Sequence, residues 1–140
     1  MKELLAMLSL VFVALLGCAH DASLSDHISV DSLVESASRL EGQQVTVSGY
    51  LRFGDDSRNL WSSKIVYMKM KNGSLSASNG PNDHCIALFD IADWRESLLS
   101  NNGKDILVSG VVRRIPLKEG EISLSECSDL GVAIRSIQRK

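Results

Sequence analysis

Near the middle of the chain, Asp83, His84 and Cys85 are consecutive. A cysteine thiolate beside a histidine base is typical of nucleophilic catalysis, and clusters of Cys, His and Asp also bind metals. Two features disfavour both roles here. Adjacent strand residues point to opposite faces, and the paired spacing of zinc ligands is absent. We therefore interpret these residues as a polar loop that enters a strand, and we expect no metal and no cofactor.

Paired carboxylates, which general acid–base catalysis uses, occur at Asp55-Asp56 and at Glu119 with Glu121. Both pairs are more simply explained by turns and hairpins. The chain also lacks a Gly-x-Ser-x-Gly elbow, a phosphate-binding glycine loop and a His-Glu-x-x-His helix. We expect a protein that is not an enzyme, with a tethered hydrolase as the less favoured alternative.

Aromatic side chains supply the remaining candidate site. They could form a stacking face for a glycan or a peptide, and the candidate residues are Tyr50, Trp61, Tyr67 and Trp94. The alternative is that the tryptophans anchor the hydrophobic core. The sequence leaves both interpretations open.

The length of 140 residues, with 44% hydrophobic and 23% charged residues, predicts one globular domain. The formal net charge of −2 and the isoelectric point near 5.9 provide no overall basic character for binding nucleic acid or an anionic membrane. We therefore expect no nucleic-acid partner.

The N-terminus carries an apolar run over residues 4–16 that only Ser9 interrupts, after a single Lys2. A spanning helix needs roughly 20 apolar residues, so this run has the length of a signal-peptide core. It ends in Leu15-Leu16-Gly17-Cys18, which resembles the bacterial lipobox, in which the Cys becomes the acylated first residue. The resemblance implies a signal peptide over residues 1–17 and lipid attachment at Cys18.

Under the sorting rule of enteric-type bacteria, Ala19 after that cysteine implies transfer to the outer membrane. We expect the anchored protein to face the periplasm. Residues 18–28 are polar and short, so they form a tether between the lipid and a single domain over residues 29–140.

With Cys18 used by lipid, Cys85 and Cys127 remain, and two cysteines in an oxidising compartment predict one disulfide. A closed loop of about 43 residues would stabilise the fold by roughly 4 kcal/mol in the chain-entropy model. The alternative is two independent buried thiols.

Short elements must position these residues. Apolar residues at helical spacing predict a helix over residues 31–41, with a capping box at Ser32–Glu35 and Gly42 as its C-terminal cap. Alternation predicts a strand over 45–52, in which Gly49 indicates a bulge or bend. A loop over 54–59 and an ambiguous segment over 64–70 follow. The further expectations are strands over 60–62, 85–90, 106–114, 121–125 and 132–137, and a helical segment over 92–99.

This pattern predicts a mainly β fold with short helices, of the α+β type. Five or six strands without alternating crossover helices favour a small curled antiparallel sheet or an OB-like five-stranded barrel, preceded by an N-terminal helix. A two-sheet sandwich is the alternative.

Several short motifs also resemble small bacterial envelope lipoproteins of uncharacterised function with an OB-fold-like domain. The match covers about residues 30–112, through Leu40-Glu41-Gly42, Val45-x-Val47-x-Gly49-Tyr50-Leu51, Leu60-Trp61-x-Ser63-Lys64, Cys85-Ile86-x-Leu88 and Val108-Ser109-Gly110-x-Val112. This resemblance implies a fold and carries no activity. We expect a lipid-anchored, non-catalytic binding or accessory module for a protein partner or a cell-wall glycan. A structural envelope lipoprotein without a specific ligand is the alternative.

Overall fold

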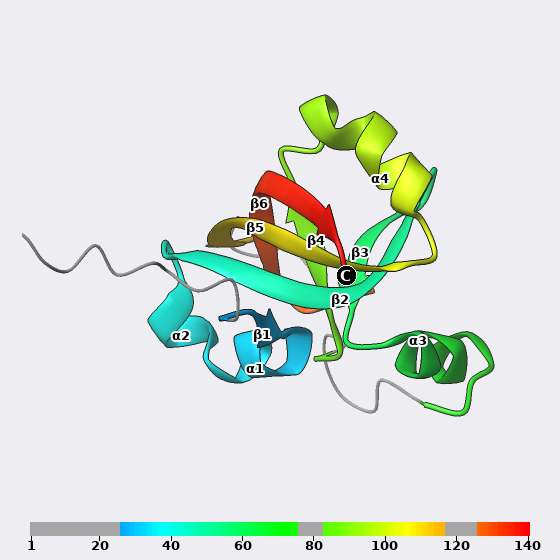
Figure 1. Cartoon of the computed structure of the whole chain (residues 1–140). Helices are drawn as coiled ribbons and strands as arrows, with labels where there is room; N and C mark the ends of the chain where they lie inside the picture. The colour runs from blue at the N-terminus through cyan, green and yellow to red at the C-terminus, as the bar shows by residue number, and fades with distance from the viewer. Residues whose placement is uncertain (1–25, 76–82, 117–125) are drawn as a thin grey trace, which may run out of the picture.

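The computed structural model describes residues 26–75, 83–116 and 126–140, and Figure 1 shows their arrangement. The expected signal peptide, Cys18 and most of the tether lie outside the described residues, as does the strand expected over 121–125. The described part is mainly β, with one six-stranded sheet and a few short helices, which confirms the expected fold class. None of the helices in this part is long and apolar enough to cross a membrane.

The N-terminal segment forms a short strand and two helical pieces, β1 (Ile28–Ser29), α1 (Val30–Glu35) and α2 (Ala37–Leu40). The single expected helix is therefore interrupted at Ser36, whose backbone leaves the helical region at φ −101° and ψ 13°. The N-terminal cap also differs from the expected capping box, in which Ser32 would be the cap. The cap is Ser29, whose Oγ accepts the backbone N–H of Ser32 at 3.1 Å. Gly42 follows at φ +79°, as expected for a helix-ending glycine.

Strand β2 (Gln44–Gly54) is the centre of the sheet. It pairs antiparallel with β5 (Asp105–Arg114) over its first half and with β3 (Ser57–Trp61) over its second half. The loop expected over 54–59 is wrong, because a two-residue turn at Asp55-Asp56 joins β2 directly to β3. Gly49 pairs in regular register and forms no bulge. It instead lets the Trp61 backbone lie close to β2, because a Cβ at Gly49 would be 2.6 Å from the Trp61 carbonyl oxygen.

Strands β4 (Cys85–Phe89) and β6 (Leu130–Arg139) complete the sheet, in the order β1-β2-β3-β4-β6-β5 with an additional β2–β5 pairing. The sheet is mixed, which corrects the expectation of a purely antiparallel one. Strands β4 and β5 follow one another along the chain but are not neighbours in the sheet, because β6 lies between them. Because β6 runs antiparallel to β5, it runs parallel to β4.

Three further helical elements accompany the sheet. The segment that the sequence left ambiguous is the helix α3 (Lys64–Lys71), capped by Ser63 Oγ, which accepts the Val66 N–H at 3.2 Å. The expected helical segment after β4 is η1 (Ala92–Trp94) followed by α4 (Arg95–Asn101). In Figure 1, α4 lies above the strands, and α1 and α3 lie below them.

Two clusters of buried side chains hold these elements together. The main core joins the inward residues of all long strands to Val30 and Leu33 of α1 and to Leu98 of α4. A second, smaller cluster lies on the outer face of the sheet and contains Tyr50, Trp61 and both cysteines of the domain. That outer face carries the candidate functional residues.

Candidate functional site

The outer face of β2, β3 and β4 presents two rows of side chains across the strands. The first row is Tyr50, Trp61 and Cys85, and the second is Arg52, Asn59 and Ala87, as the strand register sets them. Residues between these rows, such as Leu60 and Ile86, point into the main core. The alternation of side chains along each strand therefore separates the core from a functional face.

The first row is covered by α3. Tyr67 of α3 packs its ring 5.3 Å from that of Trp61 and 5.8 Å from that of Tyr50, measured between centroids. Tyr50 and Trp61 are consequently only 5% and 2% exposed. The structure thus brings together three of the four candidate aromatic residues, but as a packed cluster under a helix. Trp94, the fourth, lies against the main core.

The expected disulfide is confirmed: Cys85 and Cys127 are bonded, 42 residues apart. Both are fully buried beside the aromatic cluster. Cys85 begins β4, and Cys127 lies three residues before β6, so the bridge joins neighbouring parallel strands at the same end. The bond leaves Cys85 without a thiolate for catalysis. His84 contacts Asp31 of α1, with 3.1 Å between Nδ1 and Oδ1, and so links α1 to the start of β4.

The second row borders an open cleft of about 490 Å³. Its lining mixes apolar side chains with acceptors and donors; the lining residues are Asp56, Arg58, Asn59, Ala87, Leu88, Phe89, Ile115 and Glu126. Asn59 is 8% exposed, whereas the neighbouring Arg58 is exposed to solvent. A concave site that combines apolar side chains with a few polar groups is the usual form of a small-ligand binding site.

Two buried nitrogen atoms on the same face have no hydrogen-bond partner, Arg52 Nε and Trp61 Nε1. The Arg52 guanidinium lies over the Tyr67 ring, 4.9 Å from its centroid. This cation–π contact ties the second row to the helix that covers the first. The outer face therefore combines a closed aromatic part with an open polar part.

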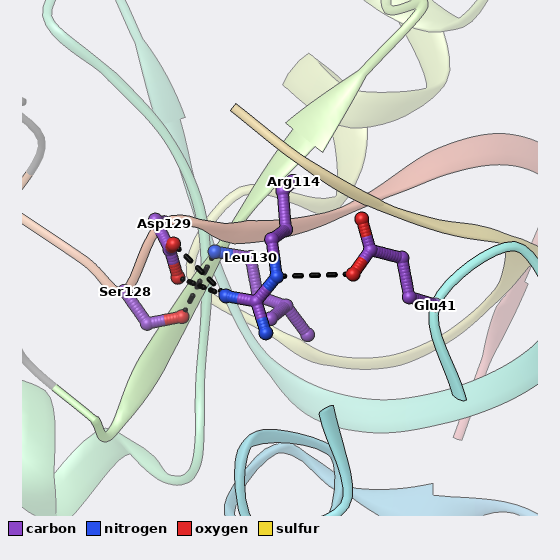
Figure 2. Close-up of polar contacts among 5 residues, drawn as sticks. All are labelled: Glu41, Arg114, Ser128, Asp129 and Leu130. Carbon is purple, nitrogen blue, oxygen red and sulfur yellow. Dashed lines mark hydrogen bonds and ion pairs between the residues drawn. The ribbon is translucent and has the colours of Figure 1, made fainter. Parts of the chain in front are cut away.

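A salt-bridge network is centred on Arg114, the residue before the cleft-lining Ile115 (Figure 2). Its guanidinium donates to Asp129 at 2.9 and 3.0 Å and to Glu41 at 3.0 Å. Hydrogen bonds from Arg114 to Asp129, and then to Glu41, raise its pKa above the ordinary value, so it stays charged. The backbone N–H of Ile115 donates to the Asp129 carbonyl at 2.7 Å. The network therefore sets where the end of β5 meets the start of β6.

Sequence reasoning did not identify the residues of the cleft, since it placed Asp56, Arg58 and Asn59 in a loop. The available signal was the Asp55-Asp56 pair, a two-residue hairpin turn between alternating segments. Cys18 lies outside the described residues. Within the described ranges, no group of three or more His, Cys, Asp or Glu side chains could hold a metal ion.

No protein-family model and no curated protein matches the chain. Among solved structures, the domain is similar to an OBody bound to hen egg-white lysozyme, with a TM-score of 0.40 and 13% identity over 72% of this chain and 84% of that one. It is also similar to a putative aspartyl-tRNA synthetase from Leishmania major Friedlin, with a TM-score of 0.45 and 12% identity over 87% of this chain and 22% of that one. Neither similarity is strong enough to assign an activity.

Proposed function

We propose that this protein is a lipid-anchored bacterial envelope protein whose domain binds a protein partner or a cell-wall glycan without catalysing a reaction. The cleft between β3, β4 and the end of β5 carries this proposal. Its apolar side chains suit a sugar ring or an apolar side chain of a partner, and its acids, its amide and Arg58 suit the polar groups of such a ligand.

The anchor is supported by the sequence Leu15-Leu16-Gly17-Cys18 and by the Cys85–Cys127 disulfide. Disulfides persist in oxidising compartments such as the periplasm and are rare in the cytosol. A tether that starts from an acylated Cys18 would hold the domain close to the outer membrane, on its periplasmic side. The resemblance to small envelope lipoproteins leads to the same location.

We further propose that the domain is an OB-like barrel. The supporting observation is the pairing of β2 with both β3 and β5, because it joins β5, the last strand of the order, back to β2. Two further features suit the same architecture. In the sheet, β6 lies between β4 and β5, and along the chain, α4 lies between β4 and β5. In OB-folds the outer face of the second and third strands binds ligands, and these strands correspond here to β3 and β4.

The binding proposal is tested by reversing the charge of Arg58, which is exposed and lines the cleft. We expect Arg58→Glu to lose the partner that the wild-type protein retains from solubilised envelopes, or the cell-wall fragments that it retains from digested peptidoglycan. Arg135→Glu, the same change at an exposed position on β6, is the matched control and should retain both.

Each result of this comparison has a distinct meaning. Retention of a peptidoglycan fragment that depends on Arg58 would identify a glycan ligand, and retention of one protein would identify a partner. Equal behaviour of both variants and the wild-type protein would contradict the cleft as a binding site. The structural alternative predicts that no ligand is retained and that an unrelated tethered domain restores detergent resistance in a deletion strain.

The anchor has its own test, the intact mass of the membrane-extracted protein. The expected mass is that of residues 18–140 plus acyl chains, with two alkylated thiols that appear only after reduction. An unacylated chain would contradict the proposed location without affecting the cleft.

A further inference from the structure

The outward side of α3 is an exposed surface that is both apolar and basic. Ile65 and Met68, which are three residues apart on the helix, leave 67% and 45% of their surface exposed. Lys64, Lys69 and Lys71 are exposed around them, and α3 contains no acidic residue. We call these five residues the α3 surface. It is a local concentration of positive charge on a chain whose formal net charge is −2.

The opposite side of the helix holds this surface outward. Val66, Tyr67 and Met70 pack on the buried cluster, and the Tyr67 ring contacts Tyr50 and Trp61. Turning Ile65 inward would pull Tyr67 out of that cluster. The exposure of the two apolar side chains is therefore a fixed consequence of how α3 packs.

We infer that the α3 surface docks on anionic phospholipid of the membrane that carries the chain, an inference that rests on the proposed lipid anchor. Lysine ammonium groups attract anionic headgroups, and an apolar helix side enters the boundary between headgroups and acyl chains. Since Ile28 belongs to β1, the part of the tether before the sheet is residues 18–27, which reach at most about 35 Å when fully extended. The anchor therefore keeps the α3 surface within reach of the bilayer at high local concentration.

The placement of α3 in the fold suits this docking. In Figure 1, α3 and β1, which is near the start of the described chain, both lie below the long strands, and α4 lies above them. A tether that enters at β1 and a helix on that side can both meet one plane. Docking through α3 would then leave α4, including its 50% exposed Leu99, directed away from the bilayer.

The test places one added tryptophan on either helix of the full-length lipidated protein. Ile65→Trp puts an indole on the α3 surface, and Leu99→Trp puts one at a similarly exposed apolar position on α4. Each variant is reconstituted in vesicles of brominated phosphatidylcholine, with or without brominated phosphatidylglycerol. The fluorescence of the wild-type protein, with its two native tryptophans, is subtracted.

We expect the added indole of Ile65→Trp to be quenched in vesicles that contain phosphatidylglycerol, and that of Leu99→Trp to keep its emission. Replacing Lys64, Lys69 and Lys71 by Gln in the Ile65→Trp variant should remove the dependence on phosphatidylglycerol, since each lysine contributes roughly a fivefold preference for the anionic surface. Equal quenching of the two added indoles, or quenching that ignores phosphatidylglycerol, would overturn the inference.

Flotation of the wild-type protein separates this inference from the proposed function. Flotation with pure phosphatidylcholine vesicles reports the anchor alone. If the protein floats but the indole of Ile65→Trp is not quenched, the anchor stands and the docking of α3 is refuted. If it floats only with phosphatidylglycerol, docking is supported and the anchor is contradicted. Absence of flotation with either lipid refutes both.

Discussion

Reduction of the Cys85–Cys127 disulfide should strongly lower the stability of the domain. The bond closes a loop with a sequence separation of 42, and it joins the start of β4 to the segment before β6. Reduction removes no side chain, although the two sulfur atoms must move apart, so the main expected change is the greater freedom of the unfolded chain. Both cysteines are fully buried, and buried thiols behave as small apolar groups, so we expect no added cost from burying the reduced thiols.

The magnitude follows from the loop length. In the chain-entropy model a loop of this size corresponds to about 4 kcal/mol of unfolding free energy. With a urea dependence of about 2 kcal/mol per molar, typical of small domains, the unfolding midpoint should fall by about 2 M. The measurement is equilibrium urea unfolding of the oxidised and the reduced protein, followed by the fluorescence of Trp61 and Trp94.

The matched control is the variant with both Cys85→Ala and Cys127→Ala. Its midpoint should lie near that of the reduced protein and should not respond to a reductant. A fall of less than about 0.5 M on reduction would refute the reasoning, because it would mean that the reduced unfolded chain stays nearly as constrained as the oxidised one.

Three further changes test how the fold is held. Gly110→Ala should destabilise the domain by about 1–3 kcal/mol in urea unfolding, because the added Cβ would lie 2.1 Å from a carbonyl oxygen of β6. The control is Gly54→Ala, whose Cβ would have nothing within 4 Å, and it should change the unfolding free energy by no more than about 0.5 kcal/mol. Ser29→Ala should cost about 1 kcal/mol by removing the cap of α1, with faster amide exchange in that helix as the specific sign. Arg114→Gln should cost up to about 1 kcal/mol, and the loss should shrink in high salt; a loss that does not depend on salt would contradict an electrostatic role.

Local signals were sufficient for most elements. The strands expected over residues 85–90, 106–114 and 132–137 correspond to β4, β5 and β6, since each carries a continuous or alternating apolar pattern. The segment over 64–70 was ambiguous because its apolar residues fit either period. In the structure it is a helix, which the Ser63 cap and the contact between the Tyr67 and Trp61 rings stabilise.

The candidate site depended far more on tertiary contacts. The sequence named Tyr50, Trp61 and Tyr67 as a ligand face, and the fold places them side by side but buries the first two under α3. The cleft was not foreseeable, because its lining comes from β3, β4 and two segments that flank β5 and β6. No local pattern encodes the meeting of strands that are distant in the chain.

By itself the sequence predicted the mainly β class, the pairing of Cys85 with Cys127 and the approximate positions of most strands. These follow from composition, the number of cysteines and the period of apolar residues, all of which are local or countable. Tertiary structure alone decided that β6 lies parallel to β4, that α3 turns Ile65 outward, and that Arg114 joins Glu41 to Asp129. Those outcomes depend on which distant surfaces pack together, and packing is a property of the whole chain.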